Sequence, residues 1–434
     1  MKKRSLSLSV DRASCPTTFD QRTDKMSILP NKPTDISYDL IIVGGGAAGI
    51  FAAAVCAEAN PDLKILVLEK GEKLLAKVRI SGGGRCNLTH ECSDIRSFVK
   101  NYPRGGSELI GPFHRFGPHE TMEWFEAHGV PVLTLDDGCV FPHADSSDAI
   151  IQALLKTASL GSVEIKTKCE VTKIQVTDNS KFTVIEANGD DYSCNHLLIA
   201  TGGGAFIEGL RHTIEKCVPS LFSFNTPDSE LKALAGIVIE NVELKASGIN
   251  AEGTLLITHS GVSGPAILRL SSFGASHLRQ ENYCFEMQIN WSPSLTEEKV
   301  FQILSDFKNK SPHKQIGTWS PIGLSSRLWH LIVSRANIDH TQEWGQCPNK
   351  SLRHIATQVC AFKLQINGKN KHKEEFVTCG GIQLKEINFK TMESRIKPGL
   401  YFAGEVLNID GLTGGFNLQA AWTTGYLAAC DVLA

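Results

Sequence analysis

The chain has 434 residues, of which 42% are hydrophobic and 21% are charged. This composition is typical of folded proteins and excludes a disordered chain, a collagen-like fibre and a small disulfide-stapled module. Lysine and arginine together number 44 against 46 acidic residues, so the net charge of −2 predicts no polyanion partner for the chain as a whole.

The 13 cysteines are an odd number and contain no Cys-x-x-Cys pair. This spacing argues against a zinc site or a dithiol redox centre, so we expect no metal. Free thiols in a chain of this length indicate a reducing compartment, and hence a cytoplasmic protein. No apolar run reaches the roughly 18 residues that a membrane-spanning helix needs, so we expect no membrane partner.

Residues 1–36 are rich in serine, threonine, lysine and aspartate and show no sustained apolar period. We interpret this segment as a disordered tail, or as sequence upstream of a true start at Met26. The first ten residues are basic and have a faint likeness to a transit peptide, which stays open as an alternative.

A β-α-β unit begins near residue 38. Residues 38–43 form an apolar run typical of a buried parallel strand, and a glycine-rich turn follows at 44–49. An alanine-rich helix is predicted from 50 to 59, and the second strand at 64–69.

The glycine turn has the spacing G-x-G-x-x-G, and Glu69 lies twenty residues after the last glycine, at the end of the second strand. This pattern indicates dinucleotide binding, because the glycines let backbone N–H groups approach a pyrophosphate while the acid accepts the ribose hydroxyls. The predicted cofactor contacts here are Gly44, Gly46, Ala47, Ala48, Gly49, Glu69 and Lys70.

The rest of the chain falls into three regions with different sequence patterns. The first continues the α/β pattern, with elements predicted at 120–128 and 148–158 (helices), 163–176 and 181–187 (a hairpin), and 196–200 (a buried strand). The second, at 205–376, has alternating strand-like runs at 236–244, 253–258 and 283–289, and a helical pattern between about 295 and 360. The third region has the α/β pattern again, with a strand predicted at 399–405 and a helix at 419–433.

Two later glycine-rich segments favour FAD over NAD as the cofactor. Thr201 and Gly202 follow a buried strand, as in the second motif of flavoproteins with two dinucleotide folds, and Gly404-Glu405 resembles their third motif. A helix then begins at a Gly-Gly pair and could stabilise the anion of reduced flavin. The predicted contacts there are Gly414, Gly415, Phe416 and Asn417.

These observations predict an α/β protein with a split Rossmann-like FAD-binding domain, formed by residues 37–204 and 377–434. The inserted domain at 205–376 is expected to hold a small β-barrel or sandwich and a helical piece.

From residue 38 to 434 the chain resembles the YhiN/BaiN-type flavoproteins, a family of NAD(P)/FAD-dependent oxidoreductases. Four segments in order carry the resemblance: Ser81–Thr89 preceded by Lys77, Thr258–Ala266, Val377–Ile382 followed by Thr391–Ser394, and Ala403–Gln419. Asn408 stands where the family commonly has Asp, which puts an acid role there in doubt. Phe416 stands where Tyr is usual, so its expected role is stacking alone.

The segment from Ser81 to Asn87 is the next candidate for contact with the flavin. Its three glycines allow close backbone approach to a ring or a phosphate, and Arg85 adds a fixed positive charge. Cys86 is either a nucleophile or a small packed thiol, and Asn87 is expected to hydrogen-bond the flavin. The predicted cofactor contacts are Lys77, Ser81, Gly82, Gly83, Gly84, Arg85 and Asn87.

Three residues are candidates for catalysis: Cys86, Asn87 and His259. His259 lies in a glycine-rich turn, where it either donates a proton to the substrate or only stabilises the turn. Thr378 and Cys379 lie where the chain re-enters the α/β domain, and they either contact the flavin or belong to the linker.

One stretch departs from the overall charge. Between 299 and 373 twelve basic residues stand against three acidic ones, a local charge of +9 that falls to +5 when the four flanking glutamates are included. The stretch is either a solvated face or a surface for a phosphate-rich partner, RNA or a nucleotide.

We therefore expect an FAD-dependent oxidoreductase. No second G-x-G-x-x-G unit follows a strand, so NAD(P)H would dock transiently as the reductant. The family resemblance implies reduction of an activated C=C bond, either an enone in a steroid-like compound or uridine to dihydrouridine in ribosomal RNA, and the basic stretch favours RNA. An amine oxidase, which would need an aromatic cage, and a non-catalytic FAD protein that binds RNA or a partner remain alternatives.

Overall fold

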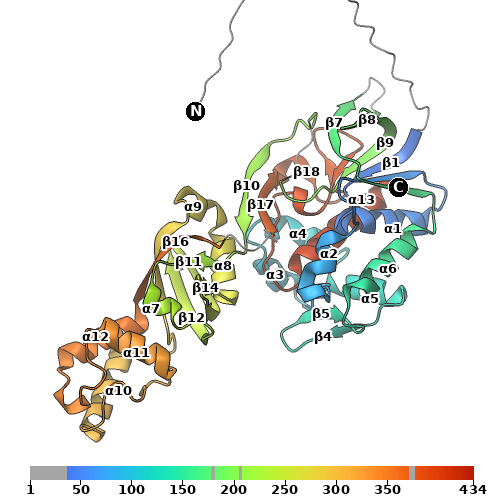
Figure 1. The fold of residues 1–434 in the computed structure, drawn as a ribbon. Coiled ribbons are helices and arrows are strands. Elements are labelled where there is room, and N and C mark those ends of the chain that lie inside the picture. Colours follow the sequence, from blue (N-terminus) through green and yellow to red (C-terminus); the bar gives the residue numbers. More distant parts are fainter. Residues whose placement is uncertain (1–36, 177–180, 205–207, 371–376) are drawn as a thin grey trace, which may run out of the picture. The chain divides into compact units, whose positions relative to one another are not determined.

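The computed structural model describes residues 37–176, 181–204, 208–370 and 377–434. The predicted tail at 1–36 and the predicted domain boundaries at 205 and 376 lie outside these residues. Figure 1 shows the course of the chain and the element labels.

A nine-stranded mixed sheet is the centre of the α/β part. Its main path has the order β18-β19-β20-β9-β1-β2-β6, and the parallel strands are β1 (Ser37–Val43), β2 (Ile65–Glu69), β6 (Val163–Thr167), β9 (Asp191–Ile199) and β20 (Leu400–Phe402). The central parallel strands β1 and β2 are covered on both faces, and their sequences are therefore nearly continuous apolar runs. Ile41 lies beside Leu66 on one side and Leu197 on the other, and all three are fully buried.

The remaining strands of this sheet are antiparallel: β7 (Val171–Val176), β8 (Phe182–Glu186), β18 (Ile387–Asn388) and β19 (Glu393–Ser394). The predicted strand at 163–176 is therefore wrong as a single element. β6 pairs in parallel with β2, whereas β7 forms a hairpin with β8. Between them Lys168 has a φ of +61°, so the chain turns there instead of continuing as one strand.

Helices from both ends of the chain pack together on this sheet. Helix α1 (Ala47–Ala59) contacts α6 (Ser147–Ala158) and the last helix, α13 (Phe416–Val432), and Figure 1 shows α1 beside the red α13. A Cβ on Gly425 would lie 2.6 Å from the carbonyl oxygen of Ala48, so this glycine permits the close crossing of α1 and α13. The predicted split of the Rossmann-like domain is thus confirmed, because β20 pairs with β9 while β1 pairs with β9 on its other edge.

Short elements between β2 and β6 complete this part. They are α2 (Ala76–Ile80), the 3-10 turn η1 (Ser81–Gly84), β3 (Thr89–His90), α3 (Ile95–Phe98), α4 (Gly106–Phe113), α5 (Pro118–Ala127), β4 (Val132–Thr134) and β5 (Cys139–Pro142). The strands β3, β5 and β4 form a small antiparallel sheet.

The insert contains a closed antiparallel barrel, as the sequence predicted. Its strands, in order around the barrel, are β11 (Phe224–Asn225), β14 (Gly261–Ser263), β13 (Ile249–Ile257), β12 (Val238–Ala246), β15 (Cys284–Asn290) and β16 (Phe362–Lys369). Helices α10 (Glu297–Lys310), α11 (Ser326–Arg335) and α12 (Asn349–Cys360) share one hydrophobic core with the barrel. Trp329 and Trp344 are fully buried in that core.

A two-stranded ribbon carries the chain into the insert and out again. It pairs β10 (Ile214–Ser220) with β17 (Val377–Ile382) in antiparallel register. The helices α7 (Ser229–Lys232), α8 (Pro265–Phe273) and α9 (Ala275–Gln280) lie between the barrel strands in sequence, and α9 contacts β10.

Candidate functional site

A cavity of about 820 Å³ opens at the carboxyl ends of the parallel strands. Its lining includes Gly44 after β1, Glu69 at the end of β2, Ala200 after β9 and Ala403 after β20. Ligands of open α/β sheets bind at this edge, and the volume is in the range of small-molecule and cofactor sites. The sheet therefore places the cavity where a dinucleotide is expected.

The three motif glycines of the turn before α1 have different roles. A Cβ on Gly44, whose φ is +116°, would lie 2.2 Å from the carbonyl oxygen of Ala200, and a Cβ on Gly49 would lie 2.0 Å from that of Gly44. Gly46 is the N-cap of α1 and lines the cavity, and its Cβ position has no atom within 4 Å. Gly44 and Gly49 therefore fix the turn, and Gly46 leaves the helix N-terminus open to an anionic group.

Glu69 is held in place by the backbone around it. One carboxylate oxygen accepts a hydrogen bond from the Gly45 N–H (2.7 Å) and the other from the Gly71 N–H (2.6 Å). The carboxylate keeps acceptor capacity toward the cavity that it lines. The adjacent Lys70 does not line the cavity, because its side chain is exposed and forms an ion pair with Glu170 (3.3 Å).

Only some residues of the glycine loop at 81–87 face the cavity. Ser81, Gly82, Gly83 and Asn87 line the cavity, whereas Gly84, Arg85 and Cys86 do not. Asn87 is oriented by its amide nitrogen, which donates to the carbonyls of Thr89 (2.9 Å) and Val140 (3.3 Å).

Arg85 points away from the cavity. Its guanidinium lies 4.2 Å from the centre of the Phe141 ring and 3.6 Å from the carboxylate of Asp145. These contacts with Phe141 and Asp145 keep the guanidinium outside the cavity, whereas the sequence predicted that Arg85 contacts the cofactor.

Cys86 is fully buried and has a φ of +65°. Burial raises the pKa of its thiol to about 12, and the hydrogen bond with Ser81 opposes this shift. The thiol is therefore protonated at neutral pH, and it does not line the cavity, which favours the interpretation of Cys86 as a packed thiol.

A second acidic group lies at the cavity wall after β20. Glu405 forms an ion pair with Lys77, and its other oxygen accepts a hydrogen bond from the Thr378 N–H (2.7 Å). Gly202 lies next to this carboxylate, since a Cβ there would be 3.8 Å from it. Thr378 thus contributes its backbone to the site and orients Glu405.

The N-terminus of α13 also opens into the cavity. Gly415, the N-cap, has a φ of +91°, and a Cβ there would lie 2.5 Å from the backbone of Thr89. The Asn417 side chain accepts from the Gly411 N–H and donates to the Gly411 carbonyl, both at 2.8 Å, which closes the loop before the helix. The seventeen-residue helix therefore directs its positive end at the cavity.

Phe416 does not reach the cavity, contrary to the prediction. Its ring is buried and stacks on His90 with a centroid separation of 4.7 Å, and it also packs against Phe98 and Tyr102. Any stacking by this side chain is within the protein core.

The cavity brings together most of the predicted cofactor residues: Gly44, Gly46, Ala47, Ala48, Glu69, Lys77, Ser81, Gly82, Gly83, Asn87, Thr201, Gly202, Gly404, Glu405, Gly414, Gly415 and Asn417. The insert supplies a further wall that the sequence did not predict, formed by Phe222, Ser263, Leu268, Lys369 and Asn370. His259 is exposed in the turn between β13 and β14 and does not line the cavity.

Sequence reasoning missed a buried ion pair behind the cavity. Arg104 binds both carboxylate oxygens of Asp410, which is fully buried, and donates to the Ser272 carbonyl (2.8 Å). Ser220, which lines the cavity, donates to the same carboxylate (2.9 Å). Burial raises the pKa of Asp410, and the Arg104 guanidinium opposes this shift. Asp410 stood beside a predicted motif, but nothing in the sequence signals Arg104, which is 306 positions away.

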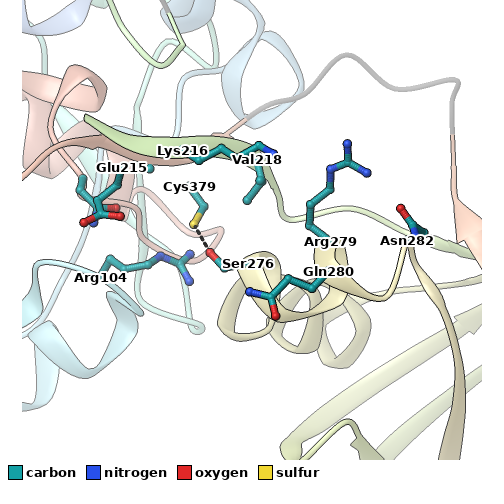
Figure 2. Close-up of a pocket in the computed structure, with 11 residues that line it drawn as sticks. Arg104, Glu215, Lys216, Val218, Ser276, Arg279, Gln280, Asn282 and Cys379 are labelled. Atoms are coloured by element: carbon teal, nitrogen blue, oxygen red, sulfur yellow. Dashed lines mark hydrogen bonds between the residues drawn. The ribbon is translucent and has the colours of Figure 1, made fainter. Parts of the chain in front are cut away.

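A second, smaller pocket of about 450 Å³ lies against the ribbon of β10 and β17. Figure 2 shows Cys379 of β17 pointing at Ser276 of α9, with Sγ and Oγ 3.6 Å apart. Burial raises the pKa of the Cys379 thiol. Cys379 thus lines this second pocket. Val377 of the same strand lines the large cavity of about 820 Å³, which we call the flavin cavity.

The residues that line the large cavity fit FAD. An open glycine at the N-terminus of α1 suits the pyrophosphate, an oriented carboxylate at Glu69 suits the ribose, and the N-terminus of α13 suits the electron-rich edge of the flavin. Because these three features lie on separate strands and helices of one continuous cavity, they suit an elongated dinucleotide.

The described residues contain no group of three or more His, Cys, Asp or Glu side chains arranged for a metal ion. In the same ranges, no helix is both long and apolar enough to cross a membrane. The twelve cysteines that the structure describes are all free thiols.

Known proteins resemble the chain over nearly its whole length. A family model described as "HI0933-like protein Rossmann domain" matches residues 38–431. The chain is 29% identical over 429 residues to a "Ribosomal RNA dihydrouridine synthase" of Escherichia coli K12, with 92% of this chain and 98% of that protein covered. It is 28% identical over 411 residues to a "3-dehydro-bile acid delta(4,6)-reductase" of Clostridium scindens, with 89% and 97% covered.

Among solved structures, a FrdA mutant of the Escherichia coli quinol fumarate reductase has a TM-score of 0.47 and 15% identity. The similarity covers 92% of this chain and 70% of that one.

Proposed function

The chain belongs to the HI0933-like family, and from this premise we propose that it reduces the C5=C6 bond of a uridine in ribosomal RNA. It is an FAD-dependent oxidoreductase. The relative from Escherichia coli is named for dihydrouridine synthesis in ribosomal RNA, and the relative from Clostridium scindens for reduction of a bile acid. Both names support reduction of a C=C bond as the reaction class.

When bound, FAD supplies a two-electron centre that can pass a hydride to an electron-poor double bond. The uracil C5=C6 bond is such an acceptor, because it is conjugated with a carbonyl. On the protein side, the N-terminus of α13 stabilises negative charge at the cavity wall, and Lys77 adds a cation held by Glu405. We propose NAD(P)H as the reductant and the cytoplasm as the location.

The observation that carries the RNA proposal is a basic–aromatic surface on the helical piece, which we define as Lys310, Lys314, Trp319 and Lys350. All four side chains are exposed, Trp319 to 56%. The Trp319 ring packs on Phe307 at 5.3 Å, which holds it in place. An exposed, fixed aromatic ring among lysines suits an unstacked base and its phosphates.

The four residues lie at one end of the helical piece. The Trp344 N–H donates to the Lys314 carbonyl (2.9 Å), and Lys308 donates to the carbonyl of Cys347 (2.6 Å), which is three residues before Lys350. In the described residues, Lys310, Lys314 and Lys350 form no ion pair with an acid. Their charges are therefore available to a polyanion.

The basic stretch as a whole carries less free charge than its composition suggests. Acidic side chains neutralise three of its cations in the pairs Arg335–Asp228, Arg353–Glu298 and Lys363–Glu286. Lys371 and Lys373 lie outside the described residues. The RNA proposal thus depends on the local surface and not on the total count.

A uridine would have to leave its stack to reach the cavity, as in other enzymes that act on bases. The wall from the insert offers Phe222 for stacking and Asn370 for hydrogen bonding. This wall makes the insert part of the substrate site in the proposal, and not only an RNA dock.

Reduction of a small enone is the second candidate, because the wall contributed by the insert is also apolar, with Leu221, Phe222 and Leu268. Amine oxidation is disfavoured. Phe222 is the one aromatic side chain in the described lining, so the lining does not supply an aromatic cage.

The test is mass mapping of ribosomal RNA from cells with and without the gene, and of that RNA after treatment with the purified enzyme, FAD and NAD(P)H. We expect one uridine to gain two hydrogens only when the enzyme is present. An unchanged RNA together with NAD(P)H-dependent reduction of an enone would overturn the uridine proposal in favour of the second candidate.

A binding measurement, fluorescence anisotropy with a ribosomal RNA fragment, tests the basic–aromatic surface. Trp319→Ala is expected to weaken binding of the RNA about tenfold, since base–aromatic stacking contributes about 1–3 kcal/mol. Phe273→Ala is the matched control, because Phe273 is also an exposed aromatic side chain but lies in α8, outside this surface. Equal affinities of the two variants would contradict this role of Trp319.

A further inference from the structure

The second pocket lies close to the flavin cavity. Three segments line both hollows with residues at most two positions apart: Val218 and Ser220 in β10, Cys379 and Val377 in β17, and Asn408 and Ile409 after β20. Two residues of a strand span about 7 Å. A ligand whose one end occupies the pocket can therefore reach the flavin cavity with its other end.

Positive charge dominates the lining of this pocket. Arg104, Lys216 and Arg279 face it, against one acid, Glu215. Arg104 is committed to Asp410, and Glu215 accepts a hydrogen bond from Gln383 (2.6 Å). Lys216 and Arg279 remain, and within the described ranges neither forms an ion pair with an acidic side chain.

The two free cations come from opposite walls. Lys216 belongs to β10 and Arg279 to the last turn of α9, and Figure 2 shows α9 facing the strand that carries Lys216. Both residues line the pocket and are exposed. A lysine ammonium and an arginine fork on facing walls are suited to an anion that accepts several hydrogen bonds.

Neutral polar groups complete the lining. Ser276, Gln280 and Asn282 supply a hydroxyl and two amides from the α9 side. Asn408 also lines the pocket, and its side-chain oxygen is inaccessible to solvent and has no hydrogen-bond partner among the described residues. A buried acceptor without a partner costs stability unless a ligand or water supplies a donor, so this atom points to a ligand that carries hydroxyl or amide donors beside its anion.

We propose that the second pocket binds a phosphate group of a nucleotide whose other end enters the flavin cavity. The inference rests on the proposed function, which supplies two such nucleotides: NAD(P)H, and the RNA segment that carries the target uridine. Lys216 and Arg279 bind the phosphate, and Asn408 accepts a hydrogen bond from the attached sugar or base. The pocket is then the anchor that orients one reactant toward the cavity.

The test compares the FAD-loaded full chain with the double variant Lys216→Gln/Arg279→Gln. The Kd of NADH and of NADPH is measured from the concentration dependence of flavin reduction without oxygen, and the Kd of an RNA fragment from fluorescence anisotropy, at one ionic strength. Inorganic pyrophosphate is added as a competitor. The control is Arg96→Gln/Lys156→Gln, which removes the same charge from exposed positions on α3 and α6 that line neither hollow.

We expect the double variant to raise one of these Kd values about tenfold with normal FAD content, and to abolish competition by pyrophosphate. A rise for NAD(P)H alone identifies the reductant as the ligand, and a rise for RNA alone identifies the substrate. If both Kd values stay within about twofold of the control variant, the phosphate proposal is wrong. If the wild type is reduced by NAD(P)H but forms no dihydrouridine, the uridine proposal fails and the reductant measurement alone decides the role of the pocket.

Discussion

Two glycine-rich segments line the same cavity, and their sequences predicted their roles unequally well. In the turn at 44–49, the predicted residues line the cavity except Gly49, which fixes the turn. In the loop at 81–87, Gly84, Arg85 and Cys86 turn away from it. Glycine content therefore marks a cofactor loop, but it does not say which side chains of that loop face the cofactor.

The difference follows from what flanks each segment. The first turn joins β1 to α1, and these regular elements set the direction of every side chain between them. The second lies between the five-residue α2 and the two-residue β3, and three consecutive glycines have positive φ. Its side chains are directed by Phe141 and Asp145, which no local pattern connects to the loop.

Gly49→Val is expected to have the largest effect, because it disrupts the turn at 44–49. Because even a Cβ there would lie 2.0 Å from the carbonyl oxygen of Gly44, we expect the free energy of unfolding to fall by about 3 kcal/mol or more, with loss of bound FAD. Denaturant unfolding and the ratio of flavin to protein absorbance measure both effects. Gly111→Ala is the control, since its Cβ position in α4 has no neighbour within 4 Å, and a normal flavin content in Gly49→Val would refute the steric account.

Glu69→Gln tests the acid of the same unit. The variant removes a charged acceptor for the ribose, and the loss of a hydrogen bond to a charged group costs about 1.5–3 kcal/mol. We expect the Kd of FAD to rise about ten- to a hundredfold in equilibrium titrations. Lys70→Gln, one residue further on, should leave the Kd within about twofold because that side chain pairs with Glu170 outside the cavity.

Cys86→Ala tests whether the Cys86 side chain, which does not line the cavity, has a role in flavin chemistry. A packed, protonated thiol predicts that flavin reduction stays within about threefold of the wild type and that the native protein resists alkylation at Cys86 near about pH 8. Rapid labelling of the native protein at this residue would instead favour a reactive thiolate.

The same residue predicts a pH dependence of stability. Burial raises the thiol pKa from 9.0 to about 12 in the folded protein. The protonated form is thus favoured by folding, so this stabilisation is complete below pH 9 and is lost as the pH rises from 9 toward 12. Unfolding free energies over this range should fall more steeply for the wild type than for Cys86→Ala, while Cys56 and Cys194, whose pKa values are also raised to about 12, contribute equally to both proteins.

The smallest effect is expected for Arg85→Gln. Its ion pair with Asp145 is exposed, so the free energy of unfolding should fall by about 1 kcal/mol or less, and the Kd of FAD should stay within about twofold. A tenfold weaker FAD complex would show that Arg85 swings to the cofactor and would remove the contrast between the two segments.

Much of the fold was predictable because its signals are local. Continuous apolar runs identified the parallel strands β1 and β2 and the apolar end of β9, and the return of glycine-ended strands after 376 indicated that β20 belongs with β1 and β9. The hairpin error at 163–176 arose because the turn at Lys168 contains neither glycine nor proline.

The parts of the site that were missed depend on contacts between distant segments. The pair Arg104–Asp410 spans 306 positions, and the wall from the insert depends on how β16 and α8 meet the cavity. Exposure is equally non-local. Trp319 and Trp329 are the same residue type ten positions apart, yet one is exposed and the other is fully buried.

The split of the sheet also orders events during synthesis. The barrel strands lie within residues 224–369, so that core can form once this stretch has left the ribosome. The cavity instead draws its lining from residue 44 to residue 421, and β20 and α13 close it. FAD capture is therefore among the last steps of maturation, and the protein must hold its first β-α-β unit without its cofactor until nearly the whole chain has been made.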